Sequence, residues 1–416
     1  MSYLASTDPE VANLLQQELE RQQSGLELIP SENIVSEAVL EALGSIGTNK
    51  YSEGYPCKRY YGGNAIIDKI ESLAITRAKQ LFGCDHVNIQ PYSGSPANQA
   101  VYFALLNPGE KVLGMSLPFG GHLTHGWKVN FSAKYYVSVQ YPTGKDGYLD
   151  YDDIARIAKE EQPKMIICGA TAYPRVIDFQ KFREIADSIG AYLVADIAHI
   201  AGLVASGVHP SPIPFADVVT TTLHKTLRGP RGAMIMCKAE LAEKIDKAVF
   251  PGLQGGPHNH VTAAAATTFL EAMQPSFKEY AAQIVKNAQS LALELLAHDF
   301  TLVTGGTDNH LLLIDLTNKG IPGKVGEAVL DEVGLTVNKN MVPFDPRSAF
   351  DPSGIRLGTP SMTTRGLKEE EMKIVGQVIA RAIAHHDNDE VKKECRQHIL
   401  DLCKRFPIYT TLSYNK

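Results

Sequence analysis

The sequence predicts an α/β protein with a large domain, built on a mostly parallel sheet covered by helices, and a smaller C-terminal α/β domain. Three observations support this fold class. Between about residues 65 and 240, continuously apolar strands alternate with helical patterns, which is typical of a parallel sheet buried on both faces. The strand–helix pattern starts again after residue 304. The chain of 416 residues also exceeds what one hydrophobic core usually serves.

The first expected element is a polar helix over residues 9–24, with Asp8 as its N-cap. Strands of the large domain are expected at residues 111–117, 164–170, 191–196, 217–223 and 233–237. A helical pattern over residues 179–189 ends at Gly190, as helices commonly do. Helices dominate residues 259–298. The small domain then follows with a strand at 310–316, a helix at 324–333, a strand through 336–338 and a terminal helix at 367–384.

Composition and charge limit the possible functions. The formal charge of −6 argues against general nucleic-acid binding, and no apolar run approaches the roughly 20 residues that cross a bilayer. The N-terminus has no basic segment leading into an apolar one, so no secretory signal is expected. The six cysteines are scattered without a CxxC pair, which favours reduced thiols over disulfides or a zinc site. We therefore expect a cytoplasmic protein with no metal site, membrane contact or nucleic-acid partner.

Two expected strands end in residues that are typical, in combination, of pyridoxal phosphate chemistry. A β-branched run from residue 217 ends at His224 and Lys225, and an apolar run ends at Asp196, followed by His199. A lysine can hold the cofactor aldehyde as a Schiff base, and a carboxylate can keep the pyridine nitrogen protonated so that the ring accepts electrons. If each residue is considered alone, Lys225 could instead be a surface lysine and Asp196 could cap a helix.

Two loops could complete a cofactor site. Ser93, Gly94 and Ser95 join a strand to a helix, where backbone N–H groups and hydroxyls can bind a phosphate. The same residues also form ordinary turns. The glycine-rich loop at residues 119–126 contains His122 and His125. One imidazole could stack on a cofactor ring, or both could make loop hydrogen bonds.

Two further segments point to a substrate site. The segment 51–63 combines four tyrosines, Glu53 and three glycines, which indicates a site-forming loop rather than a core strand or a linker. Arg356 lies on a short expected strand of the small domain, and arginine is well suited to binding an amino-acid carboxylate. A surface salt bridge is the alternative for Arg356.

These motifs, taken together, resemble the serine hydroxymethyltransferase family over nearly the whole chain. The matching segments are residues 28–33, 51–63, 196–199, 220–232, 249–257 and 363–366. The resemblance implies the fold of pyridoxal-phosphate-dependent transferases (fold type I), with a seven-stranded sheet in the large domain. It implies an N-terminal arm over residues 1–50, a large cofactor-binding domain over 51–275 and a small domain over 276–416.

The resemblance also implies a role for individual residues. Lys225 would carry the cofactor, Asp196 would face the pyridine nitrogen, His122 would stack on the ring and His199 would lie by its phenolic oxygen. The other cofactor-binding residues would be Ser93, Gly94, Ser95, Thr171, Thr222 and Arg231, with Tyr51 and Gly256 from a second subunit. Ser31 and Arg356 would hold the substrate carboxylate. Glu53 and Tyr61, also from the partner subunit, and His224 would join Lys225 in catalysis. The folate-contacting residues would be Leu117, Gly121, His122, Leu123, Asn340, Ser348, Ala349 and Phe350.

The activity implied is the reversible conversion of L-serine and tetrahydrofolate to glycine and 5,10-methylenetetrahydrofolate by a homodimer with shared active sites. Two alternatives stay open on the residues. A folate-independent aldolase of β-hydroxy amino acids, or an α-methylserine hydroxymethyltransferase, would use the same Lys225 and Asp196. A catalytically inactive scaffolding protein would have no need of Lys225, Asp196, His122 and Arg356 together.

Overall fold

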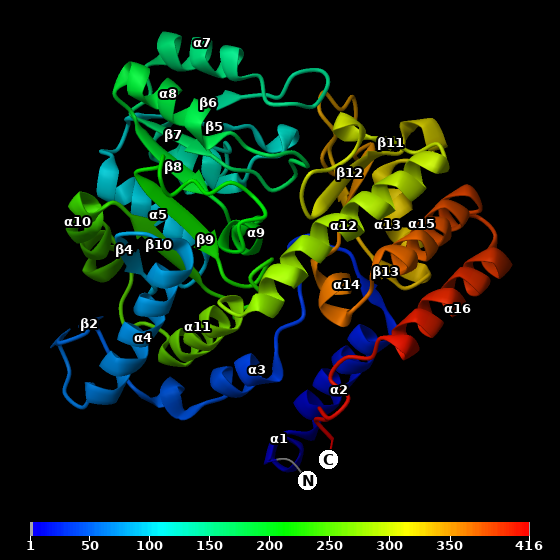
Figure 1. Cartoon of the computed structure of the whole chain (residues 1–416), viewed down its shortest axis with the longest axis horizontal. Coiled ribbons are helices and arrows are strands. Elements are labelled where there is room, and N and C mark those ends of the chain that lie inside the picture. Colours follow the sequence, from blue (N-terminus) through cyan, green and yellow to red (C-terminus); the bar gives the residue numbers. More distant parts are fainter. Residues whose placement is uncertain (1–2, 416) are drawn as a thin grey trace. The chain divides into compact units, whose positions relative to one another are not determined.

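The computed structural model describes residues 3–415, which form two compact units (Figure 1). The larger unit comprises residues 35–282, and the smaller unit combines the chain up to residue 34 with the chain from residue 283 onward. The segment 1–50, expected as one arm, is thus divided between the two units. The boundary near residue 282 falls within helix α12 (Pro275–Ala297). Among the described residues, no helix is long and apolar enough to cross a membrane.

The larger unit is built on a seven-stranded sheet with the order β4-β10-β9-β8-β7-β5-β6. Its strands are β4 (His86–Asn88), β5 (Lys111–Met115), β6 (Val137–Tyr141), β7 (Met165–Cys168), β8 (Tyr192–Asp196), β9 (Val218–Thr222) and β10 (Ala233–Cys237). Strands β5 to β9 pair in parallel, whereas β10 is antiparallel to both neighbours, β4 and β9. The predicted α/β fold with a mostly parallel sheet is therefore confirmed.

Side chains on both faces of this sheet are buried, which explains why its strands are continuously apolar. On one face, Met165 and Ile167 of β7 belong to a core cluster with Val101 and Tyr102 of α5 (Gly94–Leu105). Ile166, which alternates with them and so points to the other face, is equally buried.

Helix α8 (Phe179–Ile189) packs against β7 and β8 and has the caps that the sequence predicts. The Asp178 side chain accepts a hydrogen bond from the Lys181 N–H at its start, and Gly190 ends it in the left-handed conformation. The other elements of this unit are α3 (Glu37–Leu43), α4 (Ala65–Phe82), α6 (Phe131–Lys134), α7 (Tyr151–Glu161), α9 (Ala201–Ala205), α10 (Ala242–Lys247), α11 (Asn259–Ala272) and the hairpin of β2 (Gly54–Tyr55) and β3 (Lys58–Arg59).

The smaller unit contains a four-stranded antiparallel sheet with the order β11-β12-β15-β14. Its elements are β11 (Thr301–Leu302), β12 (Leu311–Asp315), β14 (Asn338–Asn340), β15 (Gly354–Gly358), α13 (Gly323–Glu332), α14 (Pro360–Arg365), α15 (Glu369–Ala384) and α16 (Asp389–Arg405). The strand and helices expected at 310–316, 324–333 and 367–384 correspond to β12, α13 and α15. Helix α16 was not expected.

The N-terminal segment belongs to this smaller unit through main-chain bonds. Its elements are α1 (Tyr3–Thr7), α2 (Pro9–Ser24) and β1 (Leu26–Glu27), which pairs in parallel with β13 (Leu335–Thr336). Asp8 caps α2 by accepting from the Val11 N–H, as predicted. The buried Arg365 guanidinium donates to backbone carbonyls at the end of α2, including Gly25 O at 2.6 Å. Helix α2 also packs against α16 (Figure 1).

Candidate active site

Three neighbouring parallel strands of the larger unit end in polar residues. Thr171 follows β7, Asp196 is the last residue of β8, and Lys225 follows β9, while His199 is buried in the turn after Asp196. Because β8 pairs in parallel with both β7 and β9, these strand ends lie at one edge of the sheet. Open α/β sheets bind ligands at this edge. The structure thus brings Asp196 and Lys225 to the same edge.

The Asp196 carboxylate accepts three hydrogen bonds. Oδ2 accepts from Asn98 Nδ2 at 2.9 Å and from His125 Nε2 at 3.0 Å, and Oδ1 accepts from the Ala198 N–H at 3.1 Å. Burial raises the pKa of Asp196, but the hydrogen bonds from His125 and Asn98, together with the positive charge of the nearby imidazoles in their protonated form, outweigh burial and hold the pKa well below its usual range. Asp196 is therefore ionised at neutral pH. Since a carboxylate has about four acceptor positions, one position remains on Oδ1 for a further donor.

His122 lies in a loop whose two histidines both make internal hydrogen bonds. Its Nδ1 lies 2.7 Å from Thr124 Oγ1, and its backbone N–H donates to His125 Nδ1 at 3.3 Å. Burial, with smaller effects from His125 and Lys225, lowers the pKa of His122 to about 4. The ring is neutral at pH 7 and offers a flat face to a ligand. Its stacking on a cofactor stays a prediction.

The N-terminus of α5 carries the expected phosphate-binding residues. Ser93 is the N-cap, but its side chain makes no capping hydrogen bond to this helix of 12 residues. The first backbone N–H groups are therefore left for another acceptor, and such groups suit a phosphate. A Cβ on Gly94 would lie 2.8 Å from Thr222 Cγ2, so glycine allows the close approach of α5 to the end of β9.

The end of β9 contains two buried polar atoms without a hydrogen-bond partner in the described chain, Thr222 Oγ1 and His224 Nδ1. Burial, followed by the charges of Arg231 and Lys225, lowers the pKa of His224 to about 3, so this ring is also neutral. Unpaired buried polar atoms are uncommon in proteins. Together with the remaining acceptor position on Asp196 and the uncapped helix, they fit a site for a polar ligand such as pyridoxal phosphate.

The loop after β5 contains several expected folate-contacting residues. Leu117 begins the loop, and Leu123 is 42% exposed. A Cβ on Gly121 would lie 1.9 Å from the Met115 carbonyl oxygen, so this position requires glycine. The Thr171 hydroxyl donates to the Gly121 carbonyl at 2.9 Å. Thr171 therefore connects the end of β7 to this loop.

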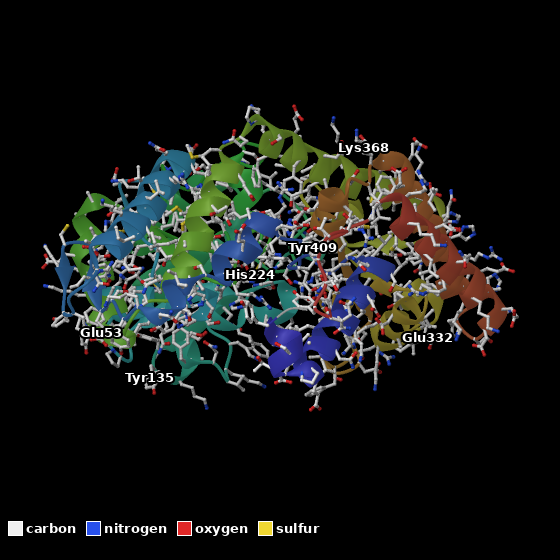
Figure 2. All side chains as sticks on the ribbon, turned by 90° about the horizontal axis from the view of Figure 1, so that it is seen from below. Glu53, Tyr135, His224, Glu332, Lys368 and Tyr409 are labelled. Atoms are coloured by element: carbon white, nitrogen blue, oxygen red, sulfur yellow. The ribbon has the colours of Figure 1, made fainter. Side chains whose placement is uncertain are left out.

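Tyr51, Glu53, Tyr61 and Gly256 form a second cluster in the larger unit. The Tyr51 hydroxyl donates to Glu53 Oε1 at 3.0 Å, and the Tyr51 and Tyr61 rings meet edge to face at 5.1 Å. Gly256 lies against the Tyr51 ring. Figure 2 shows Glu53 at an outer edge, apart from His224, which precedes Lys225. The cluster thus gathers the four residues expected from a partner subunit, and its Glu53 lies apart from His224 of the same chain.

The expected carboxylate-binding residues both lie in the smaller unit. Arg356 is in β15, where its Nε donates to Asn338 Oδ1 at 3.1 Å. Burial lowers the pKa of Arg356 to about 10, so it remains a cation at neutral pH. The Gly358 N–H bonds the Leu28 carbonyl at 2.7 Å, which aligns the segment leading to Ser31 with β15. The remaining folate-contacting candidates are Asn340, at the end of β14, and the exposed residues Ser348, Ala349 and Phe350.

The sequence did not assign roles to Asn98 and His125, the two side chains that hold Asp196. Asn98 Nδ2 also donates to Thr124 Oγ1 at 2.8 Å, and its Oδ1 accepts from Thr220 Oγ1 at 2.7 Å. His125 lies in the glycine-rich loop that the sequence singled out, and Asn98 lies in α5 just after Ser95, but the partners of both residues are distant in the chain. His122, His125 and Asp196 also bring possible metal ligands within 4.8 Å of one another, although no metal site was expected.

The fold and this site define a class of protein. A seven-stranded, mostly parallel sheet with a lysine and a partly buried, ionised aspartate at neighbouring strand ends is the arrangement of pyridoxal-phosphate-dependent transferases of fold type I.

Comparison with known proteins then gives the family. The chain matches the serine hydroxymethyltransferase family model over residues 4–379. It is 60% identical over 407 residues to the serine hydroxymethyltransferase of Desulfotalea psychrophila, covering 98% of this chain and 96% of that protein. It is 56% identical over 414 residues to the serine hydroxymethyltransferase of Acidothermus cellulolyticus, covering 98% and 97%. The chain belongs to the serine hydroxymethyltransferase family, as its motifs predicted, and this family depends on pyridoxal phosphate.

Proposed function

We propose that this protein interconverts L-serine and glycine and passes the hydroxymethyl carbon of serine to tetrahydrofolate, giving 5,10-methylenetetrahydrofolate. The observation that carries this proposal is the pair formed by Lys225 and the ionised, partly buried Asp196 at neighbouring strand ends. The pair supports lysine-bound cofactor chemistry, and membership of the family selects the reaction.

The residues of the larger unit would bind and orient the cofactor. Pyridoxal phosphate, when bound, supplies a ring that accepts the electrons left on the substrate carbon. Lys225 would hold it covalently, and Asp196 would keep the proton on its ring nitrogen. The uncapped N-terminus of α5 would bind its phosphate, aided by the unpaired Thr222 hydroxyl. The neutral ring of His122 would lie against its face, and His199, Thr171 and Arg231 would complete the set.

The substrate would be held and protonated by other residues. Arg356 and Ser31 would bind the serine carboxylate, because the planar guanidinium of Arg356 remains a cation at neutral pH and can donate two parallel hydrogen bonds to a carboxylate. Glu53 would move protons between the serine hydroxyl and the folate, next to Tyr61. His224 is neutral, so beside Lys225 it would add no positive charge.

We also propose that the active enzyme is a cytoplasmic homodimer. Glu53 lies apart from His224 (Figure 2). Tyr51 and Tyr61, which lie next to Glu53 or to each other, are 55% and 50% exposed. A second copy would cover these rings and receive them at its lysine site. The scattered thiols that suggested the cytoplasm are all unpaired among residues 3–415.

Tetrahydrofolate is the co-substrate that separates this function from a folate-independent aldolase. The candidate residues Leu117, Gly121 and Leu123 share one loop with His122, and Thr171 bonds that loop. This arrangement would present an exposed apolar side chain, Leu123, close to the cofactor site. A planar pterin is a ligand of the right character for such a surface.

An assay of serine cleavage with and without tetrahydrofolate tests the proposal, with Lys225→Gln as the inactive control. We expect tetrahydrofolate to accelerate cleavage by the wild-type protein strongly and the control to remain inactive. Cleavage that tetrahydrofolate does not change would identify an aldolase. Bound cofactor without any cleavage would identify a scaffolding protein.

A further inference from the structure

We propose that His125 is a positioning residue for the cofactor: it fixes the Asp196 carboxylate toward the ring nitrogen and ties that carboxylate to the loop that carries His122. This inference rests on the proposed function, because it assigns a role relative to the cofactor. It concerns a residue that neither the motifs nor the comparisons assign.

The two contacts of His125 determine which nitrogen carries its proton. Nδ1 accepts from the backbone N–H of His122 at 3.3 Å, so it has no proton of its own. The proton is therefore on Nε2, which lies 3.0 Å from Asp196 Oδ2 and donates to it. The neutral imidazole satisfies both contacts, so no charge on His125 is needed.

Burial fixes this geometry. His125 is 1% exposed, and a Cβ on Gly114 would lie 2.3 Å from the His125 carbonyl oxygen, so the backbone of the residue rests directly on β5. Oδ2 of Asp196 receives its second donor from Asn98, which is itself held by Thr124 and Thr220. The carboxylate cannot rotate without breaking hydrogen bonds on both sides.

These hydrogen bonds determine which oxygen of Asp196 can accept a further donor. With Oδ2 filled by two side-chain donors, the remaining acceptor position is on Oδ1, whose one donor within residues 3–415 is the Ala198 N–H. The pyridine N–H of the cofactor is the donor that this position would take. His125 also joins the ring-nitrogen partner to the backbone of His122, the residue expected against the ring face. One side chain thus sets the position of two groups that contact the same ring.

Two substitutions of similar size separate the two contacts. In His125→Asn, the shorter amide can still accept from the His122 N–H but cannot reach Asp196. In His125→Gln, the amide nitrogen lies close to the position of Nε2 and can still donate to Asp196. His209→Asn serves as a control for changing a buried histidine of the same unit, since its ring contacts Ile177 N and Pro210 O instead.

The measurement is the dissociation constant of the apo-protein for pyridoxal phosphate and for an analogue in which carbon replaces the ring nitrogen. We expect His125→Asn to weaken pyridoxal phosphate binding about tenfold, the size of one hydrogen bond to a charged group, and to leave analogue binding within about twofold. His209→Asn should stay close to wild type with both ligands. His125→Gln keeps a donor to Asp196 but leaves the His122 N–H without its acceptor, so it should weaken both ligands by a similar small factor, about threefold, and keep the wild-type preference for pyridoxal phosphate over the analogue. In serine cleavage, His125→Asn should lower kcat more than it raises KM.

Equal weakening of both ligands by His125→Asn would show that His125 only stabilises the fold and would overturn the inference. So would a His125→Gln protein that loses the preference for pyridoxal phosphate over the analogue to the same extent as His125→Asn. Failure of the wild-type protein to bind pyridoxal phosphate at all would instead refute the proposed function, so the two failures are distinguishable.

Discussion

Replacing Asp196 with asparagine, which has nearly the same shape, tests whether the negative charge of Asp196 is needed for the reaction. The amide introduced by Asp196→Asn could adopt two orientations. In one, its NH2 would face the His125 and Asn98 donors, which lie 3.0 Å and 2.9 Å from Oδ2. In the other, it would face the Ala198 N–H, which lies 3.1 Å from Oδ1. Either orientation leaves buried donors facing each other, at a cost of about 1–3 kcal/mol.

The substitution also removes the negative charge that would keep the ring nitrogen protonated. Loss of one such preorganised electrostatic partner typically costs about 3–4 kcal/mol of transition-state stabilisation, or roughly 10²–10³ in kcat. We expect Asp196→Asn to retain some pyridoxal phosphate but to lose turnover of this order in both folate-dependent serine cleavage and folate-independent 3-phenylserine cleavage. Both reactions need the same ring chemistry. Turnover within a few-fold of wild type would refute the assigned role.

Three further predictions concern the catalytic carboxyl, the shared site and Glu27, a partly buried acid of the smaller unit. Glu53→Gln should suppress folate-dependent serine cleavage far more than 3-phenylserine cleavage, since only the former passes a carbon to folate; equal losses in steady-state assays would argue for the aldolase. Co-expression of Lys225→Gln and Glu53→Gln chains should restore about one quarter of wild-type activity, because half of randomly mixed dimers are hybrids with one intact shared site; no recovery would contradict site sharing. Burial, and then Glu32, raise the pKa of Glu27 to about 8 from 4.5, so its contribution to stability is complete below pH 4.5 and is lost as the pH rises toward 8. Urea denaturation should therefore show that the free energy of unfolding of the wild type falls between pH 5 and pH 8, on the order of a few kcal/mol relative to that of Glu27→Gln. If the free energies of unfolding of the two proteins changed in parallel with pH, this prediction would be wrong.

The residues at the strand ends could be predicted because their signals are local. The β-branched run before His224 and the apolar run before Asp196 each define a buried strand, and parallel strands bring their carboxyl ends to one edge. The helix caps Asp8 and Gly190 are local in the same sense. The cofactor class therefore followed from short segments of the sequence.

Other features depend on contacts between distant residues. A continuous apolar run such as Ala233–Cys237 is found in buried parallel and antiparallel strands alike. The antiparallel direction of β10 could therefore not be predicted from its sequence. Arg365 bonds carbonyls at the end of α2 some 340 residues earlier, and this contact places the N-terminal segment in the smaller unit. The bond between His125 and Asp196 spans 71 residues. Nothing in the local pattern around either residue indicates it.

The most direct test of the cofactor site is to identify the residue that carries pyridoxal phosphate. The purified protein, loaded with the cofactor, is treated with sodium borohydride, which fixes the cofactor to the lysine that holds it, and the modified peptide is mapped by mass spectrometry. We expect a yellow protein that loses its visible absorbance on reduction, with the modification on Lys225 and none in Lys225→Gln. A modification on another lysine, or an unchanged level in Lys225→Gln, would contradict the central role of Lys225.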